Sequence, residues 1–407
     1  MYLAEEISEK WKPVMEHKDL APIADPIKRD ITLRLLENQA TALQEAAFTN
    51  NINVSGAGSI DTYDPVLISL VRRALPSLMA FDVMGVQPMS GPTGLIFAIT
   101  SAYSTQGGTE ALNAEADTDF SGAGTHVATD GSNNPFAGTW TTGAGTTTAA
   151  VEATDFDAAE MAFRIDKTSV EAKSRALQAK YTTELQQDLK AVHGLDAESE
   201  LSNILAQEII SEINREMVRT MYNAANVGAQ FASTPGTFDM DVDSSGRWSV
   251  EKFKGLLFAI ERDANAIMKN TRRGRGNVIV CSADVASALD MAGKLDTGGG
   301  AAAGLNVDTT SSTFAGVLNG KYKVYIDPYG SANPDFYVVG YKGQNAYDAG
   351  MFYCPYVPLE KVSTMDARTF QPKIGFKTRY GLVSNPFTAI TTDGNNYYRK
   401  TKVTNIL

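Results

Sequence analysis

A series of apolar residues at every fourth position between residues 201 and 221 constrains this chain more than any other feature. The series consists of Leu201, Leu205, Ile209, Ile213, Met217 and Met221. Because an α-helix has about 3.6 residues per turn, this spacing places all six side chains along one face. Gly194 suits the end of a preceding helix, and Asp196 suits the N-cap of this one. The sequence therefore predicts a helix over residues 197–225, roughly 43 Å long, which needs a sheet or another helix to cover its apolar ridge.

A long segment before this helix lacks basic residues altogether. From Ala74 to Phe163, ninety residues contain no Lys or Arg but ten Asp or Glu. The middle of the segment is rich in Gly and Thr, which loosen the backbone and tolerate extended structure. A disordered linker would share this composition, but Phe120, Phe136 and Trp140 are apolar anchors that linkers lack. We therefore expect a largely extended excursion rather than a compact core.

The remaining sequence alternates between helical and strand-like patterns. Near the N-terminus, Asp25-Pro26 is a typical helix start, and the predicted helix runs to about Ala47. A second amphipathic helix covers 253–267 and is expected to end at a Gly within 270–276. A short helix is predicted at 283–292, and strands are predicted at 277–281, 321–327, 335–341, 374–382 and 396–403. This pattern is typical of an α+β or α/β protein with a separate small sheet.

Composition argues against several classes of function. No apolar run approaches the ~18–20 residues that a membrane span needs, and the N-terminus lacks the apolar stretch of a secretory signal. Two cysteines, Cys281 and Cys354, do not make a disulfide framework and favour a reducing cytosol. The net charge of −11 argues against broad binding to a phosphate backbone, so contact with nucleic acid is expected to be non-specific at most.

No cluster of chemically active residues stands out. Histidine occurs only as His17, His126 and His193, in three separate segments, so neither a catalytic triad nor a metal site is indicated. The segment 241–252 partly fits a calcium loop, but Lys252 stands where that loop requires a bidentate Glu. The sequence therefore predicts no catalytic residue, no metal site and no cofactor, and we interpret 241–252 as a turn before a helix.

Four long stretches carry a resemblance to a known family. They are LVRRALPSLMAFDVMGVQPMSGPTGLIFA at 70–98, the segment 163–216 that contains most of the long helix, FAGVLNGKYKVYID at 314–327, and FQPKIGFKTRYGLVSNPF at 370–387. In content and order they resemble the major capsid protein of the large contractile-tailed phages related to phage T4. This resemblance implies an α+β fold, the Hong Kong 97 type of tailed-phage capsid fold, with an N-terminal arm, an extended loop, a peripheral domain and an axial domain.

The resemblance also implies how the chain is divided. Residues 1–45 would be a propeptide that binds the scaffold, 46–90 the N-terminal arm, and 91–165 the extended loop. Residues 166–245 and 345–407 would form the peripheral domain around the long spine helix, and 246–344 the axial domain. The best-known relative carries a large insertion in the loop, whereas Ser104 to Asp157 is short here. Any role of that insertion in clamping neighbouring subunits would then fall to other contacts or to a separate decoration protein.

A maturation cleavage site is implied as well. The family's prohead protease cuts after a hydrophobic-x-Glu sequence, and Leu43-Gln44-Glu45 before Ala46 fits this pattern best. Leu35-Leu36-Glu37 also fits, and Leu3-Ala4-Glu5 lies too early to release a useful segment. We predict cleavage after Glu45, and the alternative is an ordinary surface helix that stays in place.

The implied function is mechanical. Such a subunit assembles as hexameric capsomers into an icosahedral head around the genomic DNA, and proteolysis then lets the shell expand. Its implied partners are further copies of itself, a vertex protein, the scaffold, the prohead protease and the packaged DNA, and assembly is expected in the host cytoplasm. Two alternatives stay open: a vertex paralogue that forms pentamers, and a cytosolic α/β enzyme whose Gly/Thr-rich segment is a lid.

Overall fold

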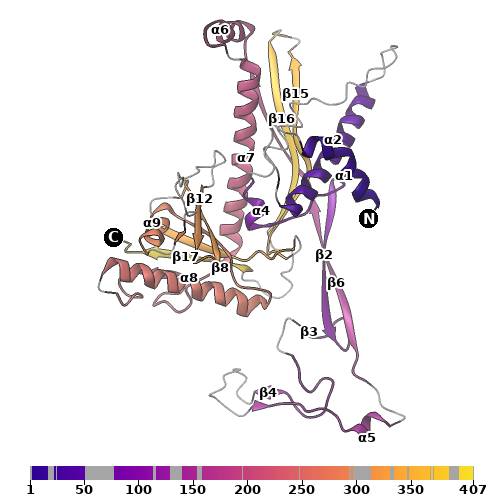
Figure 1. Cartoon of the computed structure of the whole chain (residues 1–407), viewed down its shortest axis with the longest axis vertical. Coiled ribbons are helices and arrows are strands. Elements are labelled where there is room, and N and C mark those ends of the chain that lie inside the picture. Colours follow the sequence, from indigo (N-terminus) through magenta and orange to yellow (C-terminus); the bar gives the residue numbers. More distant parts are fainter. Residues whose placement is uncertain are drawn as a thin grey trace. The chain divides into compact units, whose positions relative to one another are not determined.

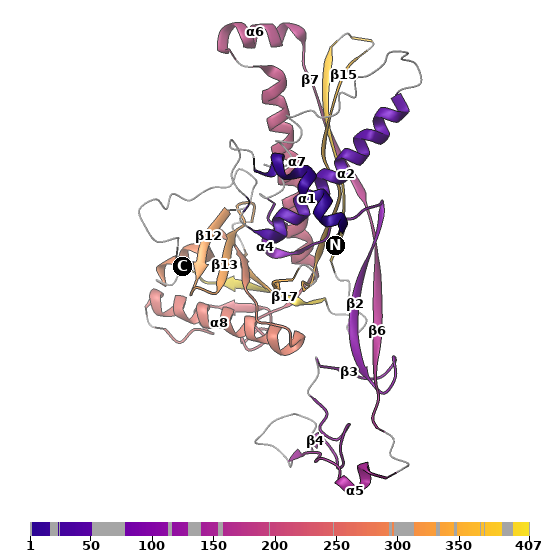
Figure 2. The ribbon, with the colours of Figure 1, turned by 45° about the vertical axis from the view of Figure 1, so that its right-hand side comes forward.

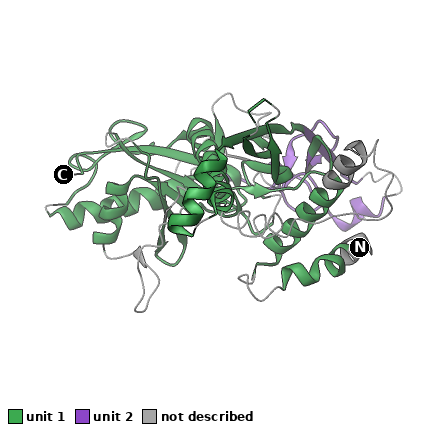
Figure 3. Ribbon diagram, turned by 90° about the horizontal axis from the view of Figure 1, so that it is seen from above, with its two compact units in different colours: residues 1–95, 169–407 green, residues 96–168 purple. Residues whose placement is uncertain are grey.

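A computed structural model describes most of the chain as two compact units. It covers residues 2–16, 23, 25–50, 78–112, 116–128, 140–153, 158–194, 196–246, 248–292, 295–296, 313–330, 334–345, 348–366, 368–369, 371–384 and 394–406. The first unit comprises Met1–Leu95 and Ser169–Leu407, and the second comprises Ile96–Thr168 (Figure 3). The first unit contains both large sheets, mixed with helices, so the predicted α+β class is confirmed.

The long helix of the first unit is α7, Ala197–Ala224, 28 residues (Figure 1). Leu205, Ile209, Ile213, Met217 and Met221 are buried, and Leu201 is partly buried against the same cluster. Asp196 occupies the N-cap position. The preceding helix α6, Thr183–His193, ends at Gly194 in the left-handed conformation, with φ 66°. The predicted helix, its apolar face and the helix end at Gly194 are thus confirmed, whereas Asp196 takes the predicted N-cap position without a capping hydrogen bond from its side chain.

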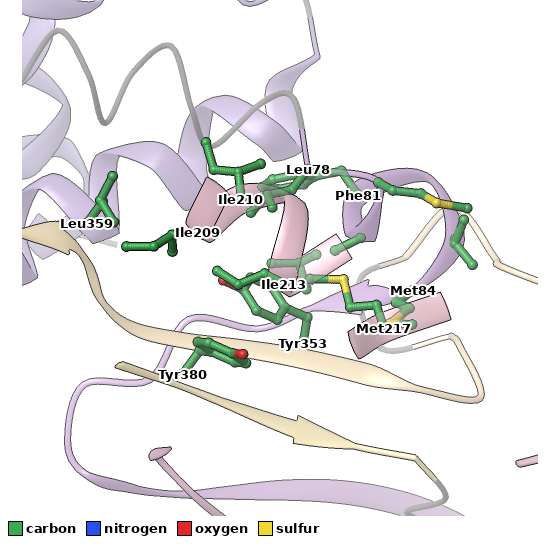
Figure 4. Packing of buried hydrophobic residues seen from close by; sticks show 14 of the residues in the cluster. Leu78, Phe81, Met84, Ile209, Ile210, Ile213, Met217, Tyr353, Leu359 and Tyr380 are labelled. Atoms are coloured by element: carbon green, nitrogen blue, oxygen red, sulfur yellow. The ribbon is translucent and has the colours of Figure 1, made fainter. Parts of the chain in front are cut away.

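A four-stranded sheet accompanies this helix. Its order is β1 (Gly85–Val86), β15 (Phe352–Met365), β16 (Pro372–Val383) and β7 (Lys173–Lys180). Ile213 and Met217 of α7 belong to one buried cluster with Tyr353 of β15 and Tyr380 of β16 (Figure 4). The sheet therefore supplies the surface that the apolar ridge of the helix requires.

An eight-stranded sheet forms a second core in the same unit. Its strands are β8 (Ala225–Val227), β9 (Thr237–Asp239), β10 (Val278–Cys281), β11 (Leu295–Asp296), β12 (Thr313–Leu318), β13 (Tyr322–Ile326), β14 (Asp335–Gly340) and β17 (Asn395–Thr404). They follow the order β11-β12-β13-β10-β14-β17-β8, and β9 also pairs with β17. Helices α8 (Ser249–Thr271) and α9 (Ala283–Met291) pack against it. The predicted small sheet is therefore larger than expected, because the late strand β17 lies in its interior.

The end of α8 corrects one expectation. Arg272, with φ 52°, takes the left-handed C-cap position that we had expected a Gly to occupy. The next glycine, Gly274, sits against Tyr341, where an added Cβ would lie 2.3 Å from the ring. Close packing rather than capping thus explains that glycine.

Among the described residues, three helices precede the first long strand. They are α1 (Tyr2–Met15), α2 (Pro26–Asn50) and α4 (Ala80–Val83). The Asp25 Oδ1 atom accepts a hydrogen bond of 3.0 Å from the Ile27 backbone N–H, so the predicted helix start is confirmed. Among the described residues, no helix is long and apolar enough to cross a membrane.

The second unit is largely extended, as predicted. It contains most of β2 (Thr93–Tyr103) and β6 (Met161–Glu171), which are neighbours in a sheet with β3 (Glu110–Ala111). Beyond them lie β4 (Val127–Ala128), β5 (Trp140–Thr141) and the short helix α5 (Thr148–Val151) (Figure 2). The Phe120 ring packs on Tyr103 at 4.4 Å between centroids, whereas Trp140 is half exposed and Phe136 lies outside the described residues.

Candidate assembly surfaces and contact networks

The extended strands of the second unit expose large apolar side chains. Phe97 on β2 and Met161, Phe163 and Ile165 on β6 are 54–71% exposed, and we call these four residues the ribbon face. On β6 they alternate with Ala162 and Arg164, which are half-buried. Because successive strand residues point to opposite sides, Met161, Phe163 and Ile165 share one side of the strand. Exposed apolar side chains of this size are typical of a surface that contacts another molecule.

A buried carboxylate joins the long helix to the eight-stranded sheet. Asp327 follows β13, and its side chain is only 3% exposed. The Arg215 Nη1 atom on α7 lies 2.7 Å from both of its oxygens, and the Tyr222 hydroxyl donates to Oδ2 at 2.8 Å. Burial, with Asp327 adding to it, holds the pKa of Tyr222 far above its usual range, so that this hydroxyl remains a donor. The cluster ties two differently built parts of the unit together.

A second network fixes the same helix to the four-stranded sheet. The Arg175 guanidinium on β7 reaches Glu212 at 2.8 Å and Glu216 at 2.6 Å, both on α7. The Tyr380 hydroxyl on β16 also donates to Glu216. These side chains are about one-third exposed. The contacts should therefore orient α7 on the sheet more than they stabilise the fold.

A second buried carboxylate lies within the eight-stranded part. Asp263 on α8 is 1% exposed and accepts hydrogen bonds from the Ala229 N–H, the Tyr337 hydroxyl and the Thr401 hydroxyl at 2.9–3.0 Å. Gly228 passes so close that an added Cβ would lie 2.8 Å from Asp263 Oδ2. The carboxylate thus joins a helix, a loop and two strands.

The segment that partly fits a calcium loop is occupied by protein contacts. Lys252 forms an ion pair with Asp241. Asp243 accepts hydrogen bonds from Ser233 N and Oγ at 2.8 and 2.6 Å and from Asp239 N at 2.9 Å. Both carboxylates therefore serve the turn that leads into α8.

The remaining candidate groups stay apart. His126 contacts Thr118 in the second unit, at 2.9 Å between Nδ1 and Oγ1, and His193 ends α6, while His17 lies outside the described residues. Burial raises the pKa of the Cys281 and Cys354 thiols to about 12, which leaves them protonated and unreactive. Among the described residues, no three His, Cys, Asp or Glu side chains gather as metal ligands do.

The predicted cleavage residues Leu43, Glu45 and Ala46 lie on α2. The backbone there is helical through Asn50. A protease needs its substrate locally extended, so cutting after Glu45 would require the end of α2 to unwind. The sequence predicted a cleavage site here but did not indicate that the preceding part of α2 belongs to the core.

In the described residues, the buried polar groups above hold structural elements together, and the ribbon face is exposed and apolar. The exposed apolar side chains are typical of a protein that contacts other chains. Residues 60–403 match the family model described as Major capsid protein Gp23. The chain therefore belongs to the Gp23 family of major capsid proteins, which are structural proteins and not enzymes.

Relatives of nearly full length agree with this assignment. The major capsid protein of Vibrio phage KVP40 is 39% identical, over 94% of this chain and 93% of the relative. Those of Salmonella phage ViI and Serratia phage KSP90 are 39% and 38% identical, over 97–99% of each chain. The Vibrio alignment spans 484 positions against 407 residues here, so that relative carries segments that this chain lacks.

More distant matches are weaker. The capsid vertex protein of Enterobacteria phage T4 is 28% identical over 59% of this chain, so the vertex alternative fits less well than the major capsid protein. Among solved structures, the capsid of Myoviridae phage XM1 has a TM-score of 0.42 with 9% identity, covering 80% of this chain and 92% of that one. The mature capsid of bacteriophage PhiM1 has a TM-score of 0.41 with 12% identity, covering 87% and 92%. The family assignment rests on the sequence relatives.

Proposed function

We propose that the chain assembles as hexameric capsomers, which close into the icosahedral head around the phage DNA. The observation that carries this proposal is the ribbon face, because each of its four large apolar side chains is more than half exposed. Contact of this surface with a different surface of a neighbouring copy is head-to-tail, and head-to-tail contacts close into rings. Many such contacts, each modest in area, sum to a stable shell.

The division of the chain remains part of the proposal. Residues 91–165 would be the extended loop, and α7 with the four-stranded sheet would be the core of the peripheral domain. The pairing of β17 with β14 and β8 favours counting 225–239 and 395–404 with the axial domain, instead of the predicted 246–344 alone. Residues 46–90 would be the N-terminal arm.

Replacing Phe163 with aspartate should abolish assembly while the subunit stays folded. A carboxylate at the centre of an apolar contact costs more than about 2 kcal/mol per interface, and the shell repeats that interface many times. Negative-stain microscopy should show tubes, sheets or rings for the unaltered chain and none for Phe163→Asp, with an unchanged circular dichroism spectrum. Thr148→Asp is the matched control, since it adds the same charge at an exposed position of the same unit, on the short helix α5. Normal assembly of Phe163→Asp would exclude the ribbon face as a contact.

Cleavage after Glu45 would trim the precursor, with residues 1–45 serving as the scaffold-binding segment until then. The chain from mature virions should begin at Ala46, and a Glu45→Gln variant should remain uncut at that bond. Intact-mass measurement of the virion protein decides this. A mature chain that begins at any other residue rules out this site, and Glu37 is the next candidate.

The partners follow from the same proposal. A vertex protein would complete the fivefold corners, and scaffold and prohead protease would act during assembly in the host cytoplasm. A decoration protein would replace clamping by a large loop insertion, and the packaged DNA would be touched only non-specifically, as the net charge of −11 favours. Counting copies per virion separates a hexamer-forming subunit from a vertex paralogue.

A further inference from the structure

The two N-terminal helices are built into the main core of the first unit. Seven of their apolar side chains are at most 6% exposed, and Leu35 and Leu36 are essentially fully buried. The seven are Trp11, Met15, Ile31, Leu33, Leu35, Leu36 and Ala40, and they belong to the same buried cluster as α7 and β15. A tail that only recruits a scaffold would have no need to bury so much of itself against its own subunit.

Polar contacts fix how these helices dock. The Asn38 Nδ2 atom on α2 donates to the Met89 carbonyl at 2.8 Å and to the Tyr356 carbonyl at 3.1 Å. Those two carbonyls come from segments far apart in the chain, so one amide ties α2 to both. Glu37 accepts from the Trp11 Nε1 atom at 2.8 Å and pairs with Lys10 at 2.9 Å, which joins α1 to α2.

Charges on the covered surface complete the contact. The Lys28 Nζ atom on α2 lies 3.9 Å from Asp82 and 5.4 Å from the centre of the Phe81 ring. A small cavity beside it is lined by Asp25, Ile27, Lys28 and Ile31 of the N-terminal segment and by Phe81, Val86, Lys342 and Gln344. Burial lowers the pKa of Lys342 to about 8, and nearby Asp82 only partly offsets this. The surface under α2 is thus a largely apolar groove that also holds the opposite charges of Asp82 and Lys342.

We propose that this groove, formed by Phe81, Asp82, Val86, Met89, Lys342 and Tyr356, is a docking site for residues 2–41 of the same chain. The segment is a removable part of the core, and its loss uncovers an apolar surface instead of merely shortening the chain. This last consequence rests on the proposed cleavage, whereas the docking itself does not. A cut between α2 and the rest should therefore leave the two pieces associated.

The test uses the full chain with a recognition sequence for a site-specific protease inserted after Asn50. After folding and cutting, residues 1–50 should co-elute with the remainder in size-exclusion chromatography. Leu36→Asp should weaken this association at least about 100-fold, because it buries a carboxylate in an apolar site. Thr41→Asp adds the same charge at an exposed position of α2 and should leave the association unchanged.

A milder variant controls for the case in which Leu36→Asp fails to fold. Asn38→Ala removes two hydrogen bonds without adding charge and should speed release of the fragment about tenfold. If the unaltered fragment elutes alone after cutting, or if Asn38→Ala and Thr41→Asp release it equally fast, the docking proposal fails. Co-elution together with a virion chain that does not begin at Ala46 would refute the cleavage site and keep the docking.

Discussion

An Asp263→Ala variant is expected to lose about 4 kcal/mol of unfolding free energy, because three buried donors lose their shared acceptor. The Ala229 N–H, the Tyr337 hydroxyl and the Thr401 hydroxyl all point at this carboxylate within 3.0 Å. Tyr337 is fully buried, and burial raises its pKa well above the usual value. Its hydroxyl therefore stays protonated and is left without this acceptor. The cavity left at position 263 is buried, so it also lowers the stability of the variant.

Urea unfolding of the subunit, followed by circular dichroism, measures this loss. Hydrogen exchange should rise first in β14 and β17, which carry Tyr337 and Thr401. Asp290→Ala removes an exposed carboxylate from the neighbouring helix α9 and should change stability by less than about 0.5 kcal/mol. Equal stability of the two variants would mean that the Asp263 contacts contribute little.

An Arg215→Met variant is expected to cost about 3 kcal/mol, because it leaves the buried Asp327 carboxylate without its cation. Methionine keeps most of the apolar stem, so lost packing adds little to the effect. Tyr222 and the Tyr329 N–H still donate to Asp327 and limit the damage. Arg215→Lys keeps the charge but cannot contact both oxygens in the same planar way, and should recover about half of the loss.

The matched control lies one turn further along α7. Arg219 is exposed, and Arg219→Met should leave stability within about 0.5 kcal/mol of the original. Hydrogen exchange should accelerate for Arg215→Met where β13 ends and α7 faces it, while β15 and β16 stay protected. Uniform acceleration across both sheets would contradict a local role for this ion pair.

The sequence predicted local elements well and non-local pairing poorly. The apolar residues from Leu201 to Met221 predicted α7, because the buried face of a helix appears in the sequence as apolar residues at helical spacing. Nothing local indicates that β17 inserts between β14 and β8, because strand pairing depends on segments some 170 residues apart. Likewise, Asp25-Pro26 predicted where α2 begins, but not that the helix buries residues on more than one side, among them Leu33, Leu35 and Leu36.

The assembly surface was the hardest part to foresee. Met161, Phe163 and Ile165 alternate as in any half-buried strand, so their pattern predicts a buried face. They are exposed in the single chain, and a sequence does not record whether the apolar side of a strand is covered by its own chain or by another. The buried carboxylates Asp263 and Asp327 gave no signal either, since their donors come from distant segments.

The central position of β17 also bears on how the protein is made. The eight-stranded sheet cannot close until residues 395–404 have left the ribosome, although β8 is synthesised some 170 residues earlier. During translation, β8 and β14 must wait with unpaired edges, which are prone to join the wrong partner. The part of the chain that contains β8, β10 and β14 can therefore reach its folded shape only after β17 has been made.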